Sequence, residues 1–218
     1  MTKERRPGME LPFDRPSSLA YARISWLPIF HFERSLVMRE LGKYRPQGTL
    51  LDIGCGPGYL TAAIIRRYPA LAVMGMDISE DMLKLAAQNL LAGKVKLLRG
   101  DAASLPLEDS SVDFIVSSAA LHHWEDASAA FREIYRVLRA GGRFLIMDIR
   151  RDAPELSYII ARIFNIFAPS ELKRTQGALG SLYTAYTTAE LAAFLAPLAF
   201  TKTAVTSGFA WMFATGVK

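Results

Sequence analysis

The sequence has one cysteine, Cys55, among its 218 residues, so it cannot form an internal disulfide bond. It also lacks a run of about 18 apolar residues, the length that a membrane-spanning helix needs. The charged N-terminal residues 1–7 lead into no apolar signal segment. These absences favour a reducing compartment, and we expect a cytoplasmic protein without integral membrane insertion.

The excess of basic over acidic residues is also small. Lys and Arg number 26 and Asp and Glu number 21, a net charge of +5, and the basic residues form separate doublets rather than one stripe. A polyanion partner needs a continuous basic groove, so we expect no nucleic-acid partner. The sequence contains no group of His, Cys and carboxylate residues with metal-ligand spacing, and we predict no metal site.

The apolar content is sufficient for a core. Hydrophobic residues make up 51% and charged residues 22% of the chain, which excludes disorder and fibrous repeats. A chain of this length fits one domain.

Short apolar runs alternate with amphipathic segments through the middle of the chain. The pattern predicts strands at 49–53, 72–76, 95–98, 112–116 and 143–149, and helices at 59–68, 79–91 and 127–138. Outside this region it predicts helices at 18–44 (broken at Pro28), 156–167 and 188–195, and strands at 200–206 and 209–215. Alternating strands and helices imply a largely parallel sheet covered on both faces. The short turn Ser207-Gly208 requires antiparallel pairing, so we expect the last strand to run against the others.

A glycine-rich turn, 54–58, follows the first predicted strand of this alternation and opens the next helix. Glycine allows a tight turn and a close approach of the backbone to a ligand. Asp77 ends the second strand, and its carboxylate can accept hydrogen bonds from both hydroxyls of a ribose. The pattern indicates a nucleotide-type site, although Tyr59 stands where the dinucleotide fingerprint requires glycine. A tight strand-to-helix turn without a ligand is the alternative.

Five sequence motifs have the order and spacing seen in one known family. They lie at 51–58, 76–79, 100–107, 111–116 and 136–144. Together they resemble the class I S-adenosylmethionine-dependent methyltransferases, in particular the small-molecule branch that includes the ubiquinone/menaquinone methyltransferases. The resemblance implies a Rossmann-like three-layer αβα sandwich with a seven-stranded, mostly parallel sheet whose last strand is antiparallel. It also implies S-adenosyl-L-methionine as the cofactor.

The resemblance assigns one group of cofactor-binding residues to the glycine loop. Gly54 and Gly56 would line the homocysteine part of the cofactor, with Cys55 and Gly58 in the same loop. Asp52 would orient the amino group of the cofactor, or could instead cap the helix region that follows. Cys55 is interpreted as a small filler rather than a nucleophile.

The resemblance assigns a second group to the ends of the later strands. Asp77 would hold the ribose hydroxyls, and Ile78 would lie against the adenine. Asp101 would accept a hydrogen bond from the adenine amino group, or could be a turn residue, while the backbone N–H of Ala102 would donate to the ring. Backbone carbonyls near Ser117 would face the methionine amino group.

Candidate catalytic residues follow the fourth strand. Methyl transfer from a sulfonium mainly requires alignment, and a base is needed only when the acceptor must first lose a proton. His122 and His123 are the candidates, and at most one should face the substrate because adjacent residues do not share a helix face. His31 lies in an apolar helical segment and is predicted to be structural.

We therefore predict a single methyltransferase domain over residues 1–218. Its parts would be an N-terminal helical cap (1–45), a cofactor-binding core (46–150), a helical lid insertion (151–190) and a C-terminal helix end and strand pair (191–218). The cap and the insertion are rich in large apolar side chains. Their helices could pack these side chains on the sheet or on each other. They could instead cover a small apolar or aromatic acceptor, contact a second subunit in a homodimer or rest on a membrane surface.

Two other functions stay open at this stage. A NAD-dependent oxidoreductase is disfavoured by Tyr59 and by the loop at Asp101. A non-catalytic cofactor-binding protein on the same fold is the second, since fold does not determine function.

Overall fold

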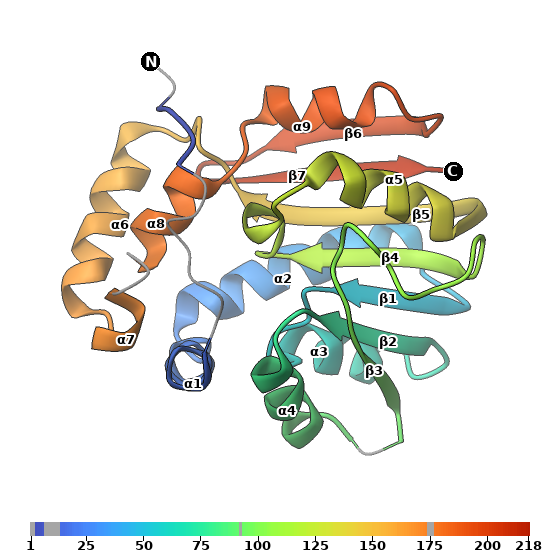
Figure 1. The fold of residues 1–218 in the computed structure, drawn as a ribbon, viewed down its shortest axis with the longest axis horizontal. Helices are drawn as coiled ribbons and strands as arrows, with labels where there is room; N and C mark the ends of the chain where they lie inside the picture. The colour runs from blue at the N-terminus through green and yellow to red at the C-terminus, as the bar shows by residue number, and fades with distance from the viewer. Residues whose placement is uncertain (1–2, 7–13, 92, 174–176) are drawn as a thin grey trace.

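The computed structural model describes residues 3–6, 14–91, 93–173 and 177–218. Its central feature is a 7-stranded sheet in the order β3-β2-β1-β4-β5-β7-β6 (Figure 1). The strands are β1 Thr49–Ile53, β2 Ala72–Asp77, β3 Val95–Arg99, β4 Val112–Ser118, β5 Leu138–Ile149, β6 Thr201–Ser207 and β7 Trp211–Val217. β1 to β5 pair in parallel and β7 is antiparallel to both of its neighbours, which confirms the predicted sheet.

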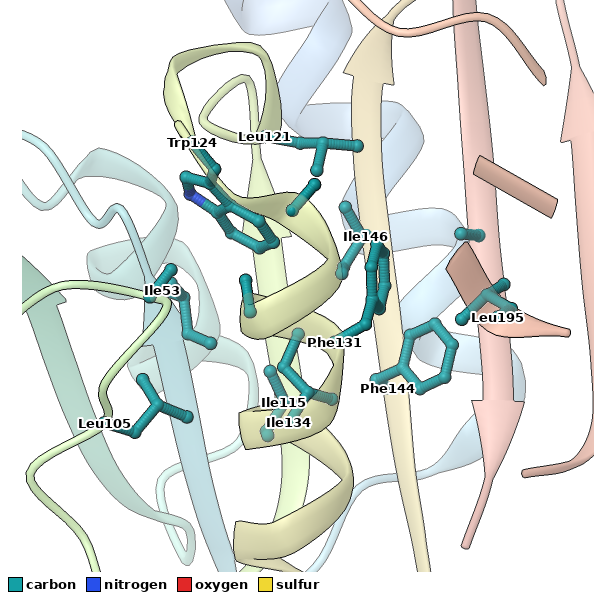
Figure 2. Packing of buried hydrophobic residues seen from close by; sticks show 14 of the residues in the cluster. Ile53, Leu105, Ile115, Leu121, Trp124, Phe131, Ile134, Phe144, Ile146 and Leu195 are labelled. Carbon is teal, nitrogen blue, oxygen red and sulfur yellow. The ribbon is translucent and has the colours of Figure 1, made fainter. Parts of the chain in front are cut away.

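Helices cover both faces of this sheet. On one face, Val37 and Leu41 of α2 (Pro28–Tyr44) and Ile64 of α3 (Tyr59–Arg67) pack against the central strands. On the other face, α5 (Ala127–Val137) and α9 (Thr188–Leu195) pack with their apolar sides inward. Figure 2 shows Phe131 of α5 beside Phe144 of β5, and the centroids of the two rings are 6.0 Å apart. The central strands are therefore buried on both faces, as their continuous apolar runs predict.

α4 (Glu80–Asn89) connects β2 to β3 and packs beside these two strands. The remaining helices lie near the carboxyl ends of the parallel strands. They are α1 Arg15–Ile24, the 3-10 helix η1 Leu121–His123, α6 Glu155–Phe167, α7 Ser170–Lys173 and α8 Gly177–Thr184. In Figure 1 α1, α6, α7 and α8 all stand on the side toward which the arrows of β1, β4 and β5 point. This arrangement leaves the carboxyl edge of the sheet under a helical cover.

The structure differs from the sequence prediction in three places. The break at Pro28 separates two helices, and the first begins at Arg15 because the side chain of Asp14 accepts a hydrogen bond from the backbone N–H of Ser17. β5 begins at Leu138 rather than at 143, since Leu138 pairs with Val112 before a register shift. The helices η1, α7 and α8 were not predicted. η1 and α7 have only 3 and 4 residues, and α8 contains Gly177 and Gly180, which disfavour a helix. Within the described part of the chain, no helix is both long and apolar enough to cross a membrane.

Candidate cofactor and acceptor site

The glycine loop forms a cradle between β1 and α3. Gly54, Gly56 and Gly58 have φ values of +72°, +52° and +81°, which side chains with a Cβ rarely adopt. A Cβ on Gly54 would lie 2.4 Å from the Cβ of Ala120, whereas a Cβ on Gly56 would meet no atom within 4 Å. Gly54 therefore allows the loop to contact the segment after β4, and Gly56 presents bare backbone to open space.

Asp77 lies beside this cradle at the end of β2. Its two carboxylate oxygens accept hydrogen bonds from the backbone N–H groups of Gly56 and Ser79, each 2.9 Å long. Burial raises the pKa of Asp77, and the two N–H groups and the nearby His123 partly oppose that rise. Each oxygen can still accept a further bond, as a ribose diol requires. The next residue, Ile78, is 64% exposed and offers an apolar surface beside the acid.

Asp52 and Cys55 are both buried beneath the loop. The Asp52 carboxylate accepts a hydrogen bond of 2.6 Å from the hydroxyl of Thr61 in the first turn of α3. Burial, with a smaller contribution from Asp77, raises the pKa of Asp52 to about 7. Burial also raises the pKa of the Cys55 thiol, which packs against Gly75, and a raised pKa disfavours the thiolate form.

Of the other predicted cofactor residues, Asp101 and Ala102 follow β3, and Ser117 lies near the end of β4. The Asp101 carboxylate accepts a hydrogen bond from the Ala103 backbone N–H at 2.9 Å, and its carbonyl accepts one from Ser104, so Asp101 stabilises a turn. Ala102 is buried in this turn. The Ser117 hydroxyl donates to the carbonyl of Ile53 at 2.7 Å and holds the ends of β4 and β1 together. The structure therefore brings every predicted cofactor residue to one edge of the sheet, while their contacts with a cofactor stay predictions.

The two adjacent histidines of η1 have different surroundings. His122 is buried, and its Nδ1 lies 2.7 Å from Oδ1 of Asp148 at the end of β5. The His122 backbone N–H donates to the other oxygen of Asp148 at 2.9 Å. His123 is exposed and acts electrostatically on Asp77, on the cofactor side. The rings contact each other, with centroids 4.1 Å apart.

Helices α1 and α2 add polar groups that were not predicted from the sequence. Glu33 of α2 accepts a hydrogen bond of 2.9 Å from the hydroxyl of Ser118. Burial and the charge of Asp148 raise the pKa of Glu33, and His122 opposes that rise. Tyr21 of α1 has a pKa raised above its ordinary value by burial and by Glu33. We call Tyr21, Glu33, Ser118, His122 and Asp148 the polar cluster.

A sequence signal for part of the polar cluster was available. Asp148 ends a predicted strand, as Asp77 does, and Glu33 stands as a single acid in the apolar helical segment 29–37. Glu33 and Asp148 are more than 100 residues apart in the sequence, and only the packing of α2 against the sheet brings them together.

Tyr59 connects the glycine loop to the N-terminal helices. Its hydroxyl lies 3.4 Å from the carbonyl of Ala22, to which it donates, and its ring makes an edge contact with Trp26, with centroids 5.5 Å apart. The Arg34 guanidinium lies 5.6 Å from the ring centroid. The residue that breaks the dinucleotide fingerprint thus connects the start of α3 to α1 and to Trp26.

Taken together, the cradle, the acid at the end of β2 and the exposed Ile78 fit the ribose and the base of a nucleoside cofactor. No group of three or more His, Cys, Asp or Glu side chains in the described ranges could hold a metal ion. The fold and the site define a Rossmann-like protein that binds a nucleoside cofactor at the carboxyl edge of its sheet.

Comparisons with known proteins agree with this class. Residues 51–146 match the sequence pattern of a family described as a methyltransferase domain. The uncharacterized methyltransferase YdaC of Bacillus subtilis is 34% identical over 105 residues, covering 48% of this chain and 58% of that protein. The ubiquinone/menaquinone biosynthesis C-methyltransferase UbiE of Syntrophotalea carbinolica is 29% identical over 186 residues, 82% of this chain and 76% of that protein. A SAM-dependent methyltransferase of Aquifex aeolicus has a similar fold, with a TM-score of 0.67 at 17% identity over 94% of this chain and 99% of that one.

Residues 51–146 carry a class I S-adenosylmethionine-dependent methyltransferase domain, whose methyl donor is S-adenosylmethionine. This confirms the family and the cofactor predicted from the five motifs, and it sets aside the nicotinamide alternative. Alignments with YdaC and two other curated relatives cover between 36% and 58% of the length of those proteins.

Proposed function

We propose that this protein transfers a methyl group from S-adenosylmethionine to a small acceptor with an apolar or aromatic body. The observation that carries the proposal is the open glycine cradle beside Asp77 and Ile78. The alignment with UbiE, whose name describes a quinone C-methyltransferase, supports a small lipophilic acceptor.

The chain would hold the donor through the residues at the carboxyl edge of the sheet. Bound there, S-adenosylmethionine supplies an electrophilic methyl group on a sulfonium. Asp77 would accept hydrogen bonds from the ribose hydroxyls, and Ile78 would contact the adenine. The bare backbone of Gly54 and Gly56 would approach the amino-acid end, where an ionised Asp52 favours an ammonium group. The remaining contacts would come from the backbone around Cys55, Gly58, Asp101, Ala102 and Ser117.

The acceptor would enter from the side of the N-terminal helices. Tyr59 ties α1 to the loop, so this cap would exclude water and help to align the acceptor, a positioning effect that contributes up to roughly 7–11 kcal/mol in enzymes. His122 or His123 would serve as the base where the acceptor must lose a proton. Residues 151–190 would act as a lid, and a homodimer contact through their exposed apolar side chains is a further proposal.

Binding of the donor tests this function directly. In calorimetry, we expect S-adenosylmethionine and S-adenosylhomocysteine to bind at micromolar levels and NAD much more weakly. Asp77→Ala should weaken binding about ten- to a hundredfold, because charge-assisted hydrogen bonds contribute roughly 1.5–3 kcal/mol.

Asp81→Ala is the matched control, since this nearby acid lies 3.6 Å from Lys84 on α4 and outside the cradle. It should leave the affinity unchanged. Tighter binding of NAD than of S-adenosylmethionine would refute the function, and an unchanged affinity in Asp77→Ala would refute the ribose role alone.

A further inference from the structure

Two charged residues of α5, Glu133 and Arg136, hold the loop that follows β3. The Arg136 guanidinium donates to the carbonyls of Leu105 and Leu107, at 3.1 Å and 2.9 Å. Glu133 accepts a hydrogen bond of 2.8 Å from the Leu105 backbone N–H. Arg136 also donates to the Asp109 carboxylate at 2.6 Å. These bonds fix the loop to one turn of α5, and we call Glu133 and Arg136 the loop clamp.

The two residues of the loop clamp also fix each other. Nε and Nη2 of Arg136 donate to the two carboxylate oxygens of Glu133, and each bond is 2.7 Å long. Such a bidentate pair orients the guanidinium as well as binding it. The hydrogen bonds from Arg136 lower the pKa of Glu133, so its carboxylate stays ionised and can accept from Leu105. A lysine could not do the same, because its ammonium lacks the planar fork of the guanidinium.

The clamped loop folds back against the turn that contains Asp101 and Ala102. A Cβ on Gly100 would lie 3.0 Å from Cδ of Pro106, so the start of the loop and its clamped segment are in close contact. Ala102 and Leu105 are buried in the same part of the core. Pro106 directly follows the doubly bonded Leu105, and a shift of the clamped segment would therefore move the turn as well.

An adenine base offers two groups to such a turn. Its 6-amino group is a donor and the neighbouring ring nitrogen is an acceptor, which matches the carboxylate of Asp101 and the backbone N–H of Ala102. A hypoxanthine base has the opposite pattern, because its 6-oxo group accepts and the neighbouring ring N–H donates. The Asp101 side chain is exposed and bonded within its own turn, so the direction of its carboxylate depends on how the turn is held.

We propose that Glu133 and Arg136 are positioning residues that set the selectivity of the cofactor site for a 6-amino purine. They hold the backbone of residues 105–107, and with it the turn at Asp101 and Ala102, where the carboxylate accepts from the amino group and the N–H donates to the ring. This inference rests on the proposed function, in which that turn binds the adenine of S-adenosylmethionine.

Calorimetry with two ligands tests this selectivity. S-adenosylhomocysteine carries adenine, and S-inosylhomocysteine is the same molecule with a 6-oxo group in place of the amino group. We expect the wild type to prefer S-adenosylhomocysteine by about tenfold or more, the factor that a hydrogen bond to a charged group contributes. Arg136→Lys and Glu133→Gln should each lower this preference by about threefold or more. A general loosening of the fold would weaken the binding of both ligands alike and leave their ratio unchanged.

Arg139→Lys is the matched control. Arg139 donates to the Ser110 carbonyl at 3.3 Å and to the Asp113 carboxylate at 2.7 Å, so it holds the far end of the same connection between β3 and β4. Its substitution should leave the ratio of the two affinities unchanged. Asp101→Ala should lower the ratio by itself, and Arg136→Lys should then have a smaller effect than in the wild type. An equal effect of Arg136→Lys in both backgrounds would overturn the route through Asp101.

The remaining outcomes decide between the inference and the proposed function. Equal affinity of the wild type for the two ligands overturns the inference, and so does an unchanged ratio in a folded Arg136→Lys. Should that variant not fold, Glu133→Gln decides by the same criterion. In the wild type itself, the Leu105 amide should exchange at least about tenfold more slowly than in an unstructured chain, and unprotected exchange overturns the loop clamp. Absence of S-adenosylhomocysteine binding in the wild type would instead refute the proposed function, and this inference with it.

Discussion

At the residue scale, Asp52 carries an energetic cost that a binding role would explain. Its carboxyl is buried with Thr61 as its side-chain partner, and burial raises its pKa to about 7. In the unfolded chain an aspartate ionises at about pH 3.9. Between these two pH values the folded protein holds a proton that the unfolded chain releases, so this group makes the protein less stable as the pH rises. A cofactor ammonium group near Asp52 would favour the ionised form and offset this cost.

Asp52→Asn should remove that dependence. The amide can still accept the hydrogen bond from Thr61 but carries no charge to bury. We expect the free energy of unfolding of the cofactor-free variant to match the wild type at about pH 4 and to exceed it by about 2–4 kcal/mol at about pH 8. Chemical denaturation at these pH values measures the difference, with the exposed Asp109→Asn as control. Equal stability of the variant and the wild type at the higher pH would show that ionisation of the buried Asp52 does not destabilise the folded protein.

At the element scale, periodicity predicted the strands because buried parallel strands are continuous apolar runs bounded by turns. The same signal could not reveal α8, in which Gly177 and Gly180 disfavour a helix, or the early start of β5, which depends on pairing with β4. The sequence could place the candidate cofactor residues at one edge of the sheet, because each lies at the end of a strand or in the loop that follows it. The polar cluster was not predictable, since Glu33, Ser118 and Asp148 are assembled by tertiary structure alone.

The contact between α1 and α3 should control how firmly the cap is held. Tyr59→Ala removes both the hydrogen bond to Ala22 and the ring contact with Trp26. Since Trp26 is itself 65% exposed, we expect less than about 1.5 kcal/mol of global destabilisation but amide hydrogen exchange in α1 that is about tenfold faster. Arg66→Ala, at the far and exposed end of the same helix, should leave exchange in α1 unchanged. Equal protection of α1 in both variants would show that Tyr59 does not anchor the cap.

At the scale of the whole molecule, α6 presents its apolar side outward. It packs on the rest of the chain through Ser157, Tyr158 and Ala161, and Tyr158 donates a hydrogen bond of 2.7 Å to the carbonyl of Arg151. The exposed side is a stripe at helical spacing, made of Leu156, Ile159, Ile160, Ile163, Ile166 and Phe167. Packing of this apolar face on the sheet, one alternative considered from the sequence, is therefore wrong for these residues. A lid, a second subunit and a membrane surface remain as ways to cover it.

The stripe should therefore be removable without loss of fold. Ile159→Gln combined with Ile163→Gln replaces side chains that are 44% and 53% exposed, so we expect a change in the free energy of unfolding below about 1 kcal/mol. Tyr158→Ala, one residue before Ile159 but on the buried side, should cost about 3–5 kcal/mol. Chemical denaturation of the two variants and the wild type, at the same low protein concentration, measures these changes in the free energy of unfolding. A loss of several kcal/mol in the double variant would mean that the stripe is covered in solution. Sedimentation of the wild type would then tell whether a second copy covers it, since a homodimer would have twice the mass and the double variant would be monomeric.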